Sequence, residues 1–139
     1  MNIDLAKLTR KNNISAYLFL AAAILCGLSL VFFAFVFTLI FGSISAIFSG
    51  VAGVGDNGFY ITDAWELYAI FFICVLMVFL QIAAFGLIKA ESRYGRIVGI
   101  VTFIVTILTF TPFALLLIYP FAFLIGNDGK YFYQHLSKK

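Results

Sequence analysis

Three long apolar runs follow one another along the chain, and polar or basic stretches separate them. The runs cover residues 15–41, 65–88 and 97–126, and each exceeds the roughly 20 residues that a helix needs to cross a bilayer. The first run, of about 27 residues, is too long for the hydrophobic region of a signal peptide, so we interpret it as a retained span. The pattern predicts membrane-spanning helices.

The stretches on either side of the first run are predicted to lie outside the membrane. Residues 1–13 are polar and basic, and we expect a solvated leader rather than a helix along the membrane surface. Residues 42–63 are rich in glycine and contain the turn sequence Asp56-Asn57-Gly58, which predicts one long external loop. The first half of this loop is apolar enough that it can instead lie at the membrane interface or extend the first helix.

The third run has Thr111-Pro112 at its centre, which is compatible with one long kinked helix or with a hairpin of two short ones. A single helix would place the basic tail on the opposite side from Arg93 and Arg96. A hairpin returns the tail to the same side, with Thr111 as N-cap and Pro112 at the first helical position. We therefore predict a hairpin, whose arms are about 27 Å long.

These segments define one membrane domain over residues 1–139. The four predicted spans are about residues 15–41, 65–88, 93–111 and 112–129. Tyr119-Pro120 predicts a kink inside the last of them.

The charges orient the four segments. All nine Lys and Arg residues fall in the leader, in the connection between the second and third spans, or in the tail, whereas the opposite loop carries only acidic side chains. By the positive-inside rule both termini are cytoplasmic. We predict an all-α integral membrane protein: a four-helix transmembrane bundle in the bacterial inner membrane, with a tight hairpin between its third and fourth helices.

Composition agrees with this class and excludes others. The chain is 64% hydrophobic and 11% charged, with a mean hydropathy of +1.12, far from the values of soluble domains. The net charge of +3 comes from cations that flank apolar runs, which are topology signals. We therefore expect membrane lipids as partners and no nucleic acid.

Small and weakly polar residues recur at helical spacing inside the spans. From Gly95 to Thr109 they follow steps of four, three, four and three, so they share one helix face. Small residues let helices approach closely in lipid, and the amide of Gln81 can bond across to a neighbouring helix. We predict a helix-packing interface that comprises Ala23, Gly27, Gln81, Gly95, Gly99, Thr102, Thr106 and Thr109.

The polar chemistry of an enzyme or a proton-coupled transporter is not found in this pattern. No ionisable residue lies in the middle of a predicted span, and His135 stands alone in the tail. Cys26 and Cys74 lie in separate apolar runs without a CxxC motif, and we interpret them as buried structural residues. The many Phe residues are better explained as lipid-facing filler than as the lining of a lipid or quinone groove. We expect no catalytic site, metal or cofactor.

Between Phe85 and Phe132 the chain resembles a recurrent pattern in small uncharacterised four-span bacterial inner-membrane proteins. In that pattern a Gly-Leu pair ends the second span, and an aromatic-small-Arg triplet, an aliphatic helix, a Phe-Pro-type turn and a short basic tail follow. The matching parts here are Gly86-Leu87, Tyr94-Gly95-Arg96, Ile97 to Leu108, Phe110-Thr111-Pro112-Phe113 and Gly129-Lys130-Tyr131-Phe132. Phe113-Ala114 stands where that pattern often has Gly-Thr. The resemblance implies an architecture and no activity.

These observations favour a non-enzymatic accessory or structural subunit that packs laterally on a larger membrane complex. A homo-oligomer through the Gly95 to Thr109 face is a close alternative. An alternative of another class is a self-associating pore or carrier for water or a small neutral solute. Its polar lining would be Thr102, Thr106, Thr109 and Gln81.

Overall fold

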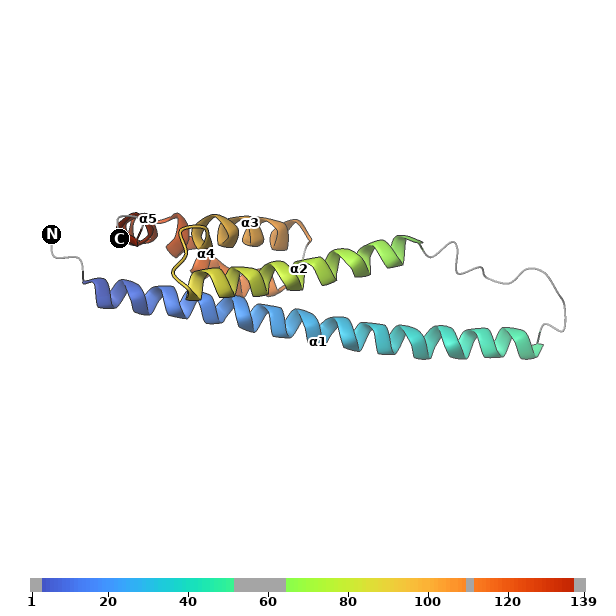
Figure 1. Cartoon of the computed structure of the whole chain (residues 1–139). Helices are drawn as coiled ribbons and strands as arrows, with labels where there is room; N and C mark the ends of the chain where they lie inside the picture. Colours follow the sequence, from blue (N-terminus) through green and yellow to red (C-terminus); the bar gives the residue numbers. More distant parts are fainter. Residues whose placement is uncertain (1–3, 52–64, 110–111, 137–139) are drawn as a thin grey trace.

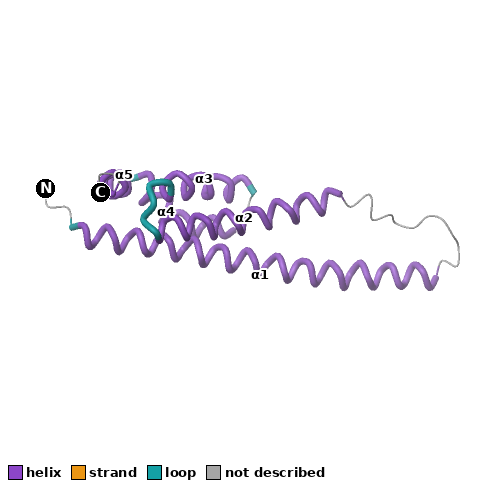
Figure 2. Tube along the Cα trace, viewed as in Figure 1, coloured by secondary structure: helices purple, strands orange, loops and turns teal. Residues whose placement is uncertain are grey.

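The computed structural model describes residues 4–51, 65–109 and 112–136, and every element in these ranges is a helix (Figures 1 and 2). The elements are α1 (Leu5–Val51), α2 (Trp65–Lys89), α3 (Gly95–Leu108), the 3-10 helix η2 (Pro112–Leu117), α4 (Ile118–Ile125) and α5 (Asn127–Leu136). The prediction of an all-α chain is confirmed for these ranges.

The first helix starts much earlier than its apolar run. Asp4 Oδ1 accepts from the backbone N–H groups of Ala6 (3.1 Å) and Lys7 (3.3 Å), so Asp4 acts as the N-cap of α1. Leu8 and Asn12, one turn apart, are both buried against the rest of the chain. The expectation of a solvated leader is therefore wrong, because an N-cap and a buried face make this segment the first part of α1.

At its other end α1 also exceeds the predicted span. The helix continues to Val51 and comprises 47 residues, which corresponds to about 70 Å. The predicted loop at 42–63 therefore begins too early, and its apolar first half extends the helix. Residues 52–63 lie outside the described residues.

The second helix matches its prediction and runs antiparallel to α1 (Figure 1). Its end is closed by two backbone bonds, from Glu91 N to Ile88 O (3.1 Å) and from Ser92 N to Leu87 O (3.0 Å). Glu91 has a φ of 54°, the left-handed conformation that this type of helix ending requires. The tight ending turns the chain back toward α3.

The third apolar run is a hairpin, but its arms are shorter than predicted. α3 has 14 residues and is about 21 Å long. The returning arm begins with η2 at Pro112, as predicted, and α4 continues it. The 6 residues of the 3-10 helix η2 and the 8 residues of the α-helix α4 together span about 24 Å. Residue 111, the predicted N-cap, lies outside the described residues.

The sharp bend in the last segment is not at Pro120. The segment from Pro112 to Ile125 and the following α5 meet at an angle of 63°. Gly126 lies at this bend with extended backbone (φ −61°, ψ 165°). The predicted kink therefore lies six residues further along, because Pro120 sits in the first turn of α4, where proline is tolerated.

Two described helices are long and apolar enough to cross a membrane, Leu5–Ile40 within α1 and Tyr68–Lys89 within α2. A third is possible if the bent segment from Pro112 to Leu136 counts as one span. The protein is thus all-helical with two or three candidate spans.

The helices form a bundle over only part of the length of α1. α2 packs on α1 and α3, while η2 and α4 pack on α1 and α3, so that these elements form a closed ring of packed helices. The fully buried side chains Phe19, Ile88, Leu117 and Leu124 fill this ring. The start of α1, the connection between α2 and α3, and α5 all lie at the same end of the molecule (Figure 1).

Candidate functional site

The predicted face of α3 is turned into the bundle. Gly95, Gly99, Thr102 and Thr106 are buried, and Thr109 is partly buried. A Cβ on Gly95 would lie 2.8 Å from the backbone oxygen of Leu87. A Cβ on Gly99 would meet side chains of α4, α2 and α1, the nearest being Leu124 Cδ1 at 2.5 Å. This face is therefore occupied by the chain's own helices.

The threonine hydroxyls of α3 are bonded to their own helix. Thr102 Oγ1 donates to Val98 O over 2.7 Å, and Thr106 Oγ1 donates to Thr102 O over 2.7 Å. Thr109 Oγ1 lies 3.1 Å from Val105 O and 3.1 Å from the sulfur of Met77 on α2. These bonds satisfy the hydroxyls inside an apolar bundle and leave the helix surfaces free to pack.

Gln81 is the most polar side chain inside the ring, and it is fully buried. Its Nε2 lies 3.8 Å from the sulfur of Cys26, a contact between α2 and α1. Its Oε1 has no hydrogen-bond partner among the described residues. Because sulfur is a weak acceptor, Gln81 is held less well than a fully bonded amide.

The two small residues predicted on α1 have different surroundings. Ala23 is buried at 3% exposure, in contact with the bundle. Gly27 is only partly buried, and a Cβ added there would meet nothing within 4 Å. Gly27 is thus not closely packed against the described residues of this chain, and its role in helix packing stays a prediction.

An apolar groove takes the place of packing there. It has a volume of about 330 Å³ and is lined by Gly27, Leu30, Val31, Ala34, Phe71, Val75, Val78 and Phe79. On α2 its lining extends from Phe71 to Phe79, and Met77, whose sulfur contacts Thr109, lies within this stretch. The sequence does not signal this groove, since its lining is indistinguishable from lipid-facing filler.

The start of α1, the connection between α2 and α3, and α5 lie at one end of the molecule, which we call the basic end (Figure 1). This end contains a polar network that was not predicted. Asn12 Nδ2 donates to Ile88 O over 2.9 Å, and the Tyr133 hydroxyl donates to Asn12 Oδ1 over 2.8 Å. Both side chains are buried, and burial raises the pKa of the Tyr133 hydroxyl. The sequence did contain a pattern that indicates a buried helix face here. It comprises residues at steps of four, three and four, which share one helix face: Leu8, Asn12, Ser15 and Phe19.

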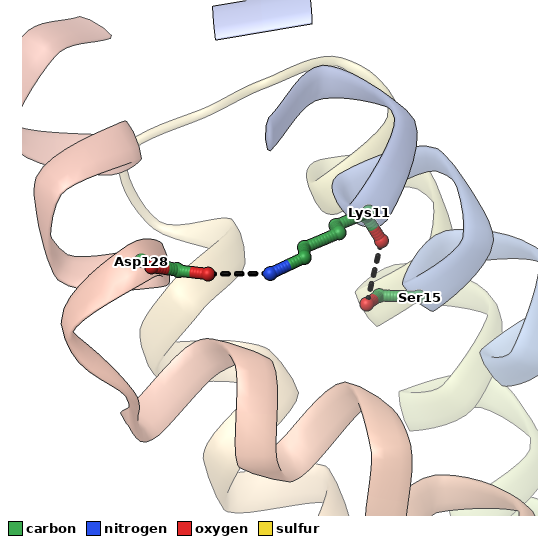
Figure 3. Close-up of polar contacts among 3 residues, drawn as sticks. All are labelled: Lys11, Ser15 and Asp128. Atoms are coloured by element: carbon green, nitrogen blue, oxygen red, sulfur yellow. Dashed lines mark hydrogen bonds and ion pairs between the residues drawn. The ribbon is translucent and has the colours of Figure 1, made fainter. Parts of the chain in front are cut away.

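Two further contacts hold α4 and α5 to the bundle. Lys11 Nζ and Asp128 Oδ2 form an ion pair of 2.5 Å between α1 and α5 (Figure 3). The hydrogen bond to Asp128 is the main cause that raises the pKa of Lys11. Arg96 Nε on α3 donates to the backbone oxygen of Leu124 on α4 over 2.8 Å. The basic end is thus a folded cap and not a set of loose loops.

The chemistry of the described residues is that of packing and hydrogen bonding. They contain no group of three or more His, Cys, Asp or Glu side chains that would suit a metal ion. Cys26 and Cys74 are both free thiols, the first buried and the second partly buried. Comparison of the chain with protein-family models, curated proteins and solved structures finds no match.

Proposed function

We propose that this chain is a non-enzymatic accessory or structural subunit of a larger complex in the bacterial inner membrane. The observation that carries the proposal is the apolar groove between α1 and α2. The groove is the surface that we assign to lateral packing against a partner helix. The α3 face, on which the alternative of a homo-oligomer depends, is in contact with the chain's own side chains.

The outer parts of α1 and α2 support this assignment. Val31 is 69% exposed on α1 and Phe72 is 68% exposed on α2. Gly27 leaves open space at the inner end of the groove, into which a side chain of another helix fits. Close packing against small residues is what drives helix association in lipid. We infer that the partner offers a single apolar transmembrane helix.

The proposed topology keeps both termini cytoplasmic. All nine cations then lie on one side, in agreement with the positive-inside rule. α1 and α2 would cross the membrane, whereas the α3 and η2–α4 arms, about 21 and 24 Å long, fall short of a core about 30 Å thick. We therefore propose that the third and fourth segments form a hairpin embedded from the cytoplasmic side, in place of two complete spans.

The pore or carrier has less support. The hydroxyls that would line it are buried or partly buried, and they are bonded to helix carbonyls. Gln81 Oε1 has no hydrogen-bond partner among the described residues, yet the side chain lies between packed helices. We therefore keep the accessory role as the proposed function.

Site-specific photocrosslinking tests the accessory role. A photoreactive amino acid at Val31 or Phe71, inside the groove, should crosslink in the native membrane to one discrete protein band. The control position is Val101, which is 47% exposed on α3 and outside the groove. Crosslinking to lipid alone at all three positions would contradict the proposal. A band at twice the chain's own mass would identify a second copy as the occupant.

A further inference from the structure

One flank of the α1–α2 pair gathers hydrogen-bond donors at the basic end. Lys89 Nζ, at the end of α2, donates to Asn13 Oδ1 (3.3 Å) and to the Tyr17 hydroxyl oxygen (3.2 Å) on α1. The same ammonium lies 4.7 Å from the centroid of the Tyr17 ring, a cation–π contact. Arg10 shares this flank, because residues 10, 13 and 17 follow helical steps of three and four.

The acceptors within this group are used, and donors remain. Tyr17 accepts from Lys89 and so keeps its own proton to donate, while Asn13 keeps its amide N–H groups. Lys89 has a third N–H, and Arg10 has five. Among the described carboxylates at this end, Asp4 caps α1, Asp128 is paired with Lys11, and Glu91 lies in the turn after α2, where its charge acts on Tyr133. A cluster of donors to which no described carboxylate is paired is complementary to an anion.

The same flank becomes apolar toward the membrane. On α1, Ile24 and Leu28 are exposed, and they follow Tyr17 at steps of seven and four. On α2, Ile82 is exposed, seven residues before Lys89. Residues at these spacings lie above one another on a helix. The complementary ligand therefore has an anionic group and a hydrocarbon part.

We propose that Arg10, Asn13, Tyr17 and Lys89 form a seat for the phosphate of an anionic phospholipid, whose acyl chain lies along Ile24, Leu28 and Ile82. Arg10, Tyr17 and Lys89 are exposed, so a lipid can reach them laterally. Tyrosine and lysine side chains are also typical of the headgroup level of a membrane. The seat involves no protein partner and is independent of the accessory role.

Electron spin resonance of the full-length protein in phosphatidylcholine vesicles tests the seat. Spin-labelled phosphatidylglycerol should associate with the wild-type protein more strongly than spin-labelled phosphatidylcholine. Lys89→Gln and Arg10→Gln should each lower the preference for phosphatidylglycerol over phosphatidylcholine. The expected decrease is up to about fivefold, because each variant removes one positive charge near the membrane surface. Tyr17→Phe removes one donor without changing the charge and should lower the preference about twofold or more.

Lys130→Gln is the matched control, because it removes one exposed cation from α5, whose described side-chain bonds to α1 are at Lys11 and Asn12 and not at the proposed seat. It should leave the preference within about twofold. An equal loss in Lys130→Gln would overturn the seat in favour of diffuse charge, and so would no preference in the wild type. Displacement of the labelled lipid by millimolar inorganic phosphate would also overturn it, because a headgroup seat needs the acyl chain.

Circular dichroism shows whether each variant keeps its helices. If Lys89→Gln fails to fold, Arg10→Gln and Tyr17→Phe decide the question, since both change exposed side chains on α1. Unchanged preference in both of these folded variants would refute the proposed seat.

Discussion

The Tyr133 hydroxyl donates to Asn12 Oδ1 over 2.8 Å and joins the last described helix to the first across 121 residues of sequence. Asn12 in turn donates to the backbone oxygen of Ile88, where α2 ends. One buried amide therefore connects three helices at the basic end. This connection explains why the leader is helical and why α5 lies against the bundle.

Asn12→Ala should destabilise the protein by about 1–3 kcal/mol, because it leaves the buried Tyr133 hydroxyl without its partner. The measurement is the unfolding midpoint in mild detergent, followed by circular dichroism. Asn13→Ala is the control, since Asn13 is a partly exposed neighbour of the same residue type, and it should cost less than about 0.5 kcal/mol. Equal effects of the two substitutions would contradict the role of Asn12.

The same end of the molecule should loosen at alkaline pH. Burial raises the pKa of the Tyr133 hydroxyl above its ordinary value of 10.0, and the bond to Asp128 raises the pKa of Lys11 above 10.5. A group whose pKa is raised by folding stabilises the fold below its unfolded pKa, and this contribution is lost as the pH rises further. We expect the thermal midpoint to be level to about pH 9 and to fall above about pH 10.

Tyr133→Phe should make that alkaline decline shallower, because the variant has no phenol to ionise. Thermal scans of both proteins between about pH 8 and 11 provide the comparison. A midpoint that rises with pH in this range would show that the buried hydroxyl does not act as described.

Gly95 and Gly27 should respond differently to alanine. A Cβ on Gly95 would lie 2.8 Å from the Leu87 backbone oxygen, which cannot move without disturbing α2, so we expect a loss of about 1–3 kcal/mol. Gly27 has open space, and Gly27→Ala should change stability by less than about 0.5 kcal/mol. Detergent unfolding curves measure both, and a larger loss for Gly27→Ala would mean that a neighbour fills the groove.

Gln81→Leu should leave stability unchanged or raise it by up to about 1 kcal/mol. The substitution removes a buried oxygen that has no partner among the described residues and loses only a weak contact to Cys26. The unfolding midpoint of the purified protein measures this change. A loss of more than about 1 kcal/mol would indicate that the amide has a partner in the folded protein.

The sequence predicted those parts of the fold that depend on local pattern. The bounds of α2 follow from its apolar run, and η2 starts at Pro112 because proline suits a first helical position. The buried face of α3 follows from helical periodicity. It was not possible to assign that face to an intramolecular or an external contact, since small residues serve both.

The unpredicted parts depend on contacts between distant residues. The polar leader is helical because Asn12 is hydrogen-bonded to Ile88 and Tyr133. Both residues are distant from Asn12 in the sequence, so a local pattern does not predict these bonds. The bend at Gly126 lets α5 reach Lys11 through Asp128. The headgroup seat likewise needs Lys89 beside Asn13 and Tyr17, more than 70 residues apart in sequence.

The central claim is that the third apolar run turns back, so that both ends of the chain lie on the cytoplasmic side. Single cysteines at Asp56 and Ser137, in a background with Cys26 and Cys74 replaced by Ala, test it with a membrane-impermeant maleimide. If the run turns back, the cysteine at 56 is labelled in intact spheroplasts and the cysteine at 137 only after the membrane is opened. Labelling at 137 from outside would contradict the hairpin and require a third complete span.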